Sequence, residues 1–436
     1  MDVERKVFAK LAELIGTRSE PLAVAFSGGG DSTALLSLVL KWNKFRPVYA
    51  LIVDHGLRQG SAQEAELAQS RAKALGANGH ILKCHWSEGA PKTAVQENAR
   101  NARYQLLGDA CRELGIETLL LGHNLADQAE TVLMRKGSGS GWHGLAGIKE
   151  RSRAPIWPAL QGVTVLRPLL SCGRIDLRSY NKNNDLQWID DPSNINRSFA
   201  RIRAREYLAA HHDETQNLLA TSKAAGETLE QEQRQISSFI QNCTKMYEWG
   251  GLALLPGFYA DKSGQIAEAL RYILPAISGE ALPPSYDKRM KLARRLCASG
   301  FTGATLGGVR IISTKDMVLC VRDLGALLGR AEVSAVPPLY LKPAKPDIWD
   351  SRFAVFSLQD EVYMDALANW TQALDDSQKA LLKSLPEAAR GGMPVFIRNN
   401  KILHIPYVNF QTDKQGFKVR SLSRERLSAL LGNFYR

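Results

Sequence analysis

Short apolar runs alternate with amphipathic stretches through the first 205 residues. The apolar runs, which predict strands, cover residues 21–26, 47–54, 79–84, 118–123 and, less regularly, 163–170. Helices are predicted between them, where apolar side chains recur every three or four positions over residues 31–42, 62–76, 94–115 and 126–137. Strands that are apolar on both faces and alternate with helices are typical of parallel sheets covered on both sides. We therefore expect an α/β fold with a doubly wound parallel sheet.

The pattern changes after residue 205. Residues 206–245 are polar and helical, and they read as an exposed helix or a linker. Residues 251–330 combine helices with a strand-like segment, and the proline-containing stretch 337–350 indicates a second boundary. We predict three domains: residues 1–205, a helical linker and middle domain over 206–336, and a small α+β domain over 337–436.

The balance of charge bears on the partner. The chain has a formal net charge of +12. Such an excess favours a polyanion such as a nucleic acid, because Lys and Arg displace counterions from phosphates, although a basic enzyme with no such partner has the same composition. The segment 390–436 has nine basic residues against Asp413 and Glu425, a net of +7. Its interleaved aromatic residues suit RNA stacking or, alternatively, a small aromatic core beneath a solvated face. They are Phe396, Tyr407, Phe410 and Phe417.

Cysteines and apolar runs bear on the compartment. The six cysteines are scattered and form no CxxC pair, which argues against zinc-ribbon and iron–sulfur sites and suits a reducing compartment. The sequence has neither a signal-peptide core nor an apolar run of membrane-spanning length. We expect a cytoplasmic protein that does not contact a membrane.

The loop after the first predicted strand has the strongest chemical signal. It reads Ser27-Gly28-Gly29-Gly30-Asp31-Ser32 and directly precedes a predicted helix. Glycines there let backbone N–H groups approach phosphate oxygens, and the helix N-terminus favours negative charge, although a purely structural turn has a similar composition.

Three kinds of nucleotide-binding loop compete for this segment. A kinase-type loop would need a lysine that is missing here, and a dinucleotide fingerprint would need glycine where Thr33 stands, although Asp54 could imitate its ribose-binding acid. The SGGxDS loop of enzymes that split ATP into AMP and pyrophosphate fits in full. Because Asp31 would repel phosphates unless a cation intervened, this interpretation also predicts Mg²⁺.

Motif-rich loops follow the first, second and fourth predicted strands, and they should converge because the carboxyl ends of neighbouring parallel strands meet at one crevice. Arg100, Arg103 and Tyr104 share a helical face, from which an arginine could neutralise phosphate charge or simply form a surface ion pair. His123 ends the fourth strand, and Asp127 and Glu130 follow one helical turn apart. These three could cap a helix, or they could bind Mg²⁺ jointly with Asp31 and hold an amine.

Taken together, these motifs resemble those of the tRNA(Ile)-lysidine synthases of the PP-loop ATPase family. The resemblance covers about the first 205 residues, and its elements are SGGGDS, VDHGLR, QENARNARYQLL, DQAETVLMR, GSGSGWHGLAGI and WIDDPSNINRSFARIRAR. The family commonly reads HHADDQAET where this chain has His123-Asn124-Leu125-Ala126-Asp127. His123, Asp127 and Glu130 are kept, but the second histidine and the first aspartate are replaced.

The resemblance implies a two-step ligation on tRNA(Ile) with a CAU anticodon. ATP would adenylate the C2 oxygen of the wobble cytidine, and free L-lysine would then displace AMP. It implies that Ser27, Gly28, Gly29, Gly30, Asp31 and Ser32 bind ATP. It also implies that Asp31 and Asp127 hold Mg²⁺, that Arg103 and His123 stabilise charge on the α-phosphate, and that Asp127 and Glu130 receive lysine. The middle domain would bind tRNA, and family members often form homodimers.

Two other functions stay open. A tRNA thiolase of the same superfamily would use a catalytic or paired cysteine, for which Cys84 and Cys111 are the candidates. A non-catalytic RNA-binding protein could keep the loop as an adenine-nucleotide sensor, although the clustered acids and His123 weigh against it. A nicotinamide dehydrogenase is disfavoured by the broken glycine fingerprint.

Overall fold

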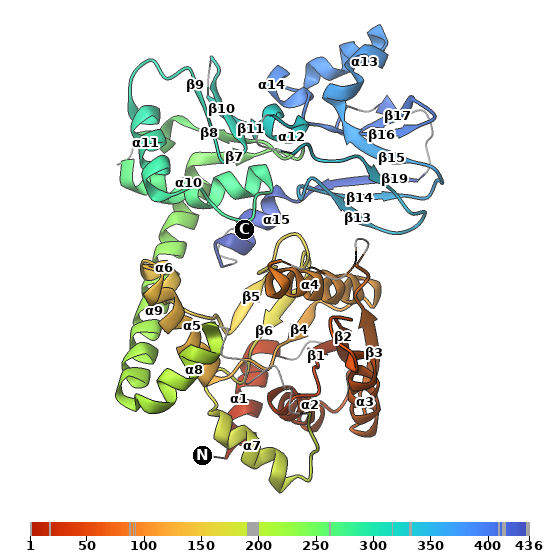
Figure 1. The fold of residues 1–436 in the computed structure, drawn as a ribbon. Coiled ribbons are helices and arrows are strands. Elements are labelled where there is room, and N and C mark those ends of the chain that lie inside the picture. The colour runs from red at the N-terminus through yellow and green to blue at the C-terminus, as the bar shows by residue number, and fades with distance from the viewer. Residues whose placement is uncertain are drawn as a thin grey trace. The chain divides into compact units, whose positions relative to one another are not determined.

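The computed structural model divides the chain into two compact units, Met1–Gln231 and Glu232–Arg436 (Figure 1). It describes residues 2–16, 19–86, 89, 91, 93–189, 200–260, 263–315, 317–330, 334–408, 410–411 and 416–432. The predicted domain boundaries after residues 205 and 336 remain predictions. Among the described residues, no helix combines the length and the apolar character that crossing a membrane requires.

The first unit is built from repeated strand–helix pairs. Its strands are β1 (Leu22–Ala25), β2 (Val48–Asp54), β3 (Asn78–Lys83), β4 (Thr118–Leu120), β5 (Arg151–Arg153) and β6 (Thr164–Leu166). Its helices are α1 (Val3–Ile15), α2 (Gly30–Trp42), α3 (Ser61–Ala74), α4 (Val95–Glu113), α5 (Leu125–Gly137), α6 (Trp142–Leu145), α7 (Arg174–Asn183), α8 (Ala200–Ala210) and the N-terminal part of α9 (His212–Cys243).

The strands form one sheet in the order β3-β2-β1-β4-β6-β5. All neighbours are parallel except β5, which runs antiparallel to β6. The predicted parallel sheet is thus confirmed, and the antiparallel edge strand β5 was not predicted. Since β1 lies between β2 and β4, the loops that follow these three strands emerge side by side at the carboxyl edge of the sheet.

Both faces of this sheet are covered, as the continuous apolar strands predicted. Leu22, Val24 and Phe26 pack on one face against α1, α2, α3 and α7. Ala23 and Ala25 point to the opposite face, where α4 supplies Tyr104, Leu107 and Cys111. This alternation along β1 explains why the strand is apolar at every position. The sheet is therefore doubly wound.

The polar segment after residue 205 differs from the expected exposed linker. Leu208 of α8 and Leu218 of α9 form a small apolar cluster with Ala129 and Val132 of α5. Further along α9, Ala225 and Leu229 pack near Trp142. Helix α8 and the N-terminal part of α9 therefore cover α5 and belong to the packed structure of the first unit.

The second unit has three antiparallel sheets and several short helices. The sheet β7-β8-β11-β10-β9 contains β7 (Thr244–Met246), β8 (Leu252–Leu254), β9 (Gly303–Leu306), β10 (Val309–Ser313) and β11 (Val318–Arg322). The other two are β12-β15-β16-β17-β18 and β13-β14-β19, with β12 (Leu339–Tyr340), β13 (Asp347–Trp349), β14 (Phe353–Ser357), β15 (Tyr363–Ala366), β16 (Pro394–Arg398), β17 (Lys401–Ile405), β18 (Phe410–Gln411) and β19 (Phe417–Ser421). The α-helices are α10 (Ser263–Ser278), α11 (Tyr286–Cys297), α12 (Leu324–Leu328), α13 (Asp376–Leu381), α14 (Glu387–Arg390) and α15 (Ser423–Leu430), and the 3₁₀ turns are η2 (Pro256–Phe258), η3 (Leu367–Ala373) and η4 (Leu382–Ser384).

Strand β11 belongs to two cores at once. Val318 and Cys320 face a core formed with α10, α11 and α15. Leu319 and Val321 face the opposite way, into a core shared with β14, β15 and β16. The two-residue period of a strand places these pairs on opposite faces.

The aromatic residues of the basic tail are largely structural. Phe396 is fully buried and lies 4.6 Å, centroid to centroid, from Phe417. Tyr407 packs against the same core. The RNA-stacking interpretation is therefore wrong for Phe396, whereas the alternative of an aromatic core fits. The side chain of Phe410 and residues 412–415 lie outside the described residues.

Candidate active site

Two serine hydroxyl groups stabilise the glycine-rich loop between β1 and α2. Ser32 Oγ donates to the Gly29 carbonyl oxygen at 2.9 Å, and Ser27 Oγ lies 3.2 Å from Ser32 Oγ. From α7, Asn181 Nδ2 donates to the Gly30 carbonyl oxygen at 2.8 Å. The first turn of α2 follows at once, and its N–H groups have no partner within the helix. The loop thus has the form of an anion site.

Two glycines allow close packing around this loop. Gly28 has a φ of +76°, and an added Cβ would lie 2.9 Å from Ile189 Cδ1. Gly122, in the loop after β4, would place a Cβ 3.3 Å from the backbone of Asp31 and Ser32. The loops after β1 and β4 are therefore in close contact, as their positions in the sheet predicted.

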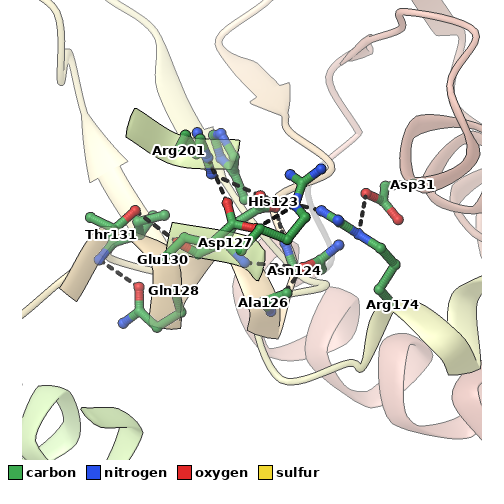
Figure 2. Close-up of polar contacts among 12 residues, drawn as sticks. Asp31, His123, Asn124, Ala126, Asp127, Gln128, Glu130, Thr131, Arg174 and Arg201 are labelled. Atoms are coloured by element: carbon green, nitrogen blue, oxygen red, sulfur yellow. Dashed lines mark hydrogen bonds and ion pairs between the residues drawn. The ribbon is translucent and has the colours of Figure 1, made fainter. Parts of the chain in front are cut away.

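Asp31 lies in the first turn of α2 and faces Arg174 of α7. The Arg174 Nε atom is 3.7 Å from Asp31 Oδ2, and its Nη2 atom is 3.7 Å from Asp127 Oδ1 (Figure 2). Burial raises the pKa of Asp31; the charge of Arg174 opposes this change, and the charge of Asp127 adds to it. One guanidinium group therefore bridges the two carboxylates that the sequence assigned to Mg²⁺.

Asn124 starts helix α5 and explains one departure from the family motif. Its Oδ1 accepts hydrogen bonds from the N–H groups of Ala126 and Asp127 at 2.9 and 3.2 Å. In return, the backbone N–H of Asn124 donates to Asp127 Oδ2 at 2.8 Å. This is a complete capping box, so Asn124 is well suited to this position. Asp127 consequently has a structural role as well as a candidate chemical one.

Two arginines of α8 bind the acidic pair on α5. Arg201 Nη2 lies 2.7 Å from Asp127 Oδ1, and Arg201 Nε lies 2.7 Å from Glu130 Oε2 (Figure 2). Arg205 Nε lies 2.8 Å from Glu130 Oε1. The Glu130 side chain is only 1% exposed, so both of its oxygens are satisfied by guanidinium groups within the protein. The acidic pair is therefore held by positively charged side chains of the protein itself.

His123 follows β4 and contacts Arg167, which follows β6. The Arg167 Nε atom donates to His123 Nδ1 at 3.2 Å. Burial, helped by the charges of Arg167 and Arg201 and of Arg103 and Arg100 on α4, lowers the pKa of His123 to about 3. His123 is therefore neutral at physiological pH.

Arg103 of α4 acts electrostatically on His55 and His123. Its charge contributes to the lowered pKa of His55 as well as that of His123, and burial lowers its own pKa. Asp54, at the end of β2, accepts a hydrogen bond from the Gly56 N–H at 3.0 Å and shapes its own turn.

The structure thus brings the predicted residues Asp31, Asp127 and Glu130 into one chain of ion pairs, with His123 beside them. It adds four arginines that sequence reasoning did not single out, namely Arg167, Arg174, Arg201 and Arg205. Arg201 and Arg205 belong to the recognised motif at residues 188–205, and their four-residue spacing was a signal for a shared helical face. Residues 190–199 of that motif lie outside the described residues.

The donor set at Asp31 and Asp127 fits a divalent cation. Two carboxylates that already share one positive group, beside a loop suited to phosphates, are hard oxygen donors of the kind Mg²⁺ prefers.

Several known proteins are similar to this chain in sequence. A family model for the PP-loop domain matches residues 2–212. The tRNA(Ile)-lysidine synthase of Caulobacter vibrioides is 32% identical over 427 residues, which covers 94% of this chain and 93% of that protein. The enzyme of the same name from Hyphomonas neptunium is 35% identical over 310 residues, covering 70% of this chain and 83% of that protein. The one from Wolbachia pipientis is 29% identical over 428 residues, covering 94% and 95%. This chain belongs to the tRNA(Ile)-lysidine synthase family.

Proposed function

We propose that the protein ligates L-lysine to C2 of the wobble cytidine of tRNA(Ile) with a CAU anticodon, converting ATP to AMP and pyrophosphate. The observation that carries the proposal is that three groups lie together at the carboxyl edge of the sheet: a glycine-rich loop, a neutral histidine beside arginines, and a buried acidic pair held by arginines. Each of these three groups suits one reactant, and the reaction of the family to which the chain belongs uses all three reactants.

In the first step the cytidine O2 atom attacks the α-phosphorus of ATP, and the bond to pyrophosphate breaks. Ser27, Ser32 and the N-terminus of α2 would hold the phosphates, and Arg103 and His123 would stabilise the charge that develops on the α-phosphate. Mg²⁺, held by Asp31 and Asp127, would neutralise phosphate charge. The oxygen of C2 thereby becomes part of a good leaving group.

In the second step the lysine amine attacks C2, and the bond between C2 and the adenylate oxygen breaks. AMP carries the oxygen away, and the protons lost by the amine pass to solvent. Asp127 and Glu130 would receive the ammonium group of lysine, since they already bind positively charged donors. That ammonium group would have to compete with Arg201 and Arg205 for the same carboxylate oxygens.

The thiolase alternative gains no support from the cysteines. All six are free. Cys111 is fully buried, and burial raises its pKa to about 12. Burial also raises the pKa of Cys84, which reduces its fraction of reactive thiolate. We therefore propose no second function.

One incubation tests the proposal. Purified protein, ATP, Mg²⁺, L-lysine and tRNA(Ile) with a CAU anticodon should yield AMP and a cytidine heavier by one lysine less water, measured by nucleoside mass spectrometry. Omitting lysine should stop the second product, and tRNA(Met) with the same anticodon is the matched control. If no tRNA-dependent AMP forms, the proposed reaction is wrong.

We also expect a cytoplasmic location, where ATP and free lysine are available, and a homodimer stays a prediction from the family. Light scattering coupled to size exclusion would measure the mass in solution against the 48.1 kDa of one chain.

A further inference from the structure

Arg167 and His123 meet because their strands are neighbours. β4 and β6 pair in parallel, with Leu120 opposite Leu166, and each of the two side chains follows within three residues of its strand's end. The backbone N–H of Leu121 continues the ladder by donating to the Leu166 carbonyl oxygen at 2.9 Å. The sheet itself therefore sets the contact between Arg167 Nε and His123 Nδ1.

Arg167 is anchored without help from His123. Its Nη1 atom donates to the Lys149 carbonyl oxygen at 2.7 Å and to Ser152 Oγ at 3.2 Å, and its backbone N–H donates to the Glu150 carbonyl oxygen. The residue is only 7% exposed. Within the described part of the chain, no carboxylate pairs with it, so its charge stays uncompensated beside the imidazole.

The direction of the hydrogen bond between the two side chains is not ambiguous. Arginine Nε always carries a proton and can only donate. His123 Nδ1 must therefore accept, which a protonated Nδ1 cannot do. A neutral imidazole has one proton, and here that proton is on Nε2. The charged groups that act on the ring are Arg167, Arg201, Arg103 and Arg100, all of which oppose a second proton.

We propose that Arg167 is a positioning residue that holds His123 as a neutral imidazole with its proton on Nε2, so that His123 donates a hydrogen bond to the reacting phosphate and does not act as a base. The inference rests on the proposed adenylation for its chemistry. That step suits a donor, because the cytidine O2 atom attacks through a lone pair and has no proton to lose. The hydrogen bond would strengthen as negative charge develops on the phosphate oxygens.

Two variants separate the hydrogen bond from the charge. Arg167→Gln keeps an N–H donor at the same distance along the side chain but removes the charge, whereas Arg167→Met removes both. The chain has eight histidines, so the His123 signals in ¹⁵N-histidine NMR would be assigned by their loss in His123→Gln. In the unmodified protein we expect an unprotonated Nδ1 and a protonated Nε2 from pH 8 down to pH 5.

The two variants should differ in their effects on His123. In Arg167→Gln, His123 should keep its proton on Nε2 but take up a second proton at a higher pH, because a neighbouring positive charge is gone. Arg167→Met should lose the fixed tautomer as well, and its kcat for adenylation should fall by roughly tenfold with a smaller change in the KM for ATP. Its pH–rate profile should also gain an inflection on the acidic side, where His123 takes up a proton.

A proton on Nδ1, or titration of His123 near pH 6.5 in the unmodified protein, would overturn the proposal. So would an Arg167→Met variant whose His123 spectrum and pH–rate profile match those of the unmodified protein. The NMR measurement needs no substrate. A protein that made no lysidine but showed this tautomer would therefore refute the proposed function and leave the assignment of Arg167 intact.

Discussion

Replacing Glu130 with glutamine should destabilise the first unit and selectively impair the use of lysine. Glu130 is 1% exposed and makes two ion pairs of 2.7 and 2.8 Å, while Arg201 and Arg205 are 40% and 30% exposed. Breaking a fully buried pair costs about 3–5 kcal/mol, and breaking an exposed one costs below about 1 kcal/mol. With a buried acid and half-solvated partners, we expect a loss of about 2 kcal/mol, which lowers Tm by roughly 4–8 °C for a unit of this size.

The catalytic effect should be confined to the second step. Glu130 holds no phosphate in the proposed mechanism, so tRNA-dependent pyrophosphate release in Glu130→Gln should stay close to normal. The KM for lysine should rise by at least about tenfold, since losing one charged hydrogen bond costs about 1.5–3 kcal/mol. The two assays are pyrophosphate release without lysine and lysidine formation over a range of lysine concentrations.

Glu64→Gln is the matched control. Glu64 pairs with Arg58 at 2.6 Å, but the two side chains are 35% and 41% exposed. The change should cost below about 1 kcal/mol and leave the lysine KM unaltered. If Glu130→Gln melts no earlier than Glu64→Gln, the burial argument fails. If it melts earlier but uses lysine normally, Glu130 has only a structural role.

Three further predictions follow from the site and the surface. Asp31→Asn should reduce Mg²⁺-dependent pyrophosphate release on the order of 100-fold with an unchanged melting curve, and near-normal release would remove Asp31 from the cation site. His123 has a folded pKa of about 3, below the unfolded value near 6.5, so between these values only the unfolded chain takes up the proton. The free energy of unfolding should therefore decrease as the pH is lowered through this range, by up to about 1.4 kcal/mol per pH unit. Urea titrations at pH 7 and 4.5 should show a smaller decrease in His123→Gln than in the unmodified protein. Lys291 and Arg294 are exposed on α11. Changing both to glutamine should weaken tRNA binding and reduce the slope of log K against log salt concentration by about 1–2, and an unchanged slope would exclude contact of these residues with phosphates.

The fold of the first unit was predictable because its strands are apolar on both faces. The residues of β1 alternate between two helix layers, and only a sheet covered on both sides accepts such a run. Helix α9 was misjudged because its composition is polar. Its buried positions Leu218, Ala225 and Leu229 are seven and four residues apart, and that apolar stripe was the signal for packing.

The acids of the site were predictable, but most of their partners were not. Asp31, His123 and Asp127 stand at strand ends and helix starts, where position along the chain already indicates a crevice. Arg174 reaches Asp31 and Asp127 only through the packing of α7 against α2. The spacing of residues along the sequence does not predict that contact. Arg167 lies inside a segment that the sequence predicts as a strand. Its orientation toward His123 depends on the pairing of β4 with β6.

The two-faced strand β11 has a consequence for how the second unit unfolds. Leu319 and Val321 supply the C-terminal core, and Val318 and Cys320 of the same strand supply the other core. If one core melted, the face of β11 that packs against it would be exposed to water. The two halves should therefore open as a single cooperative unit in hydrogen exchange. A chain cut after residue 336 would expose an apolar sheet face and should aggregate, so loss of the C-terminal region would also compromise the middle region.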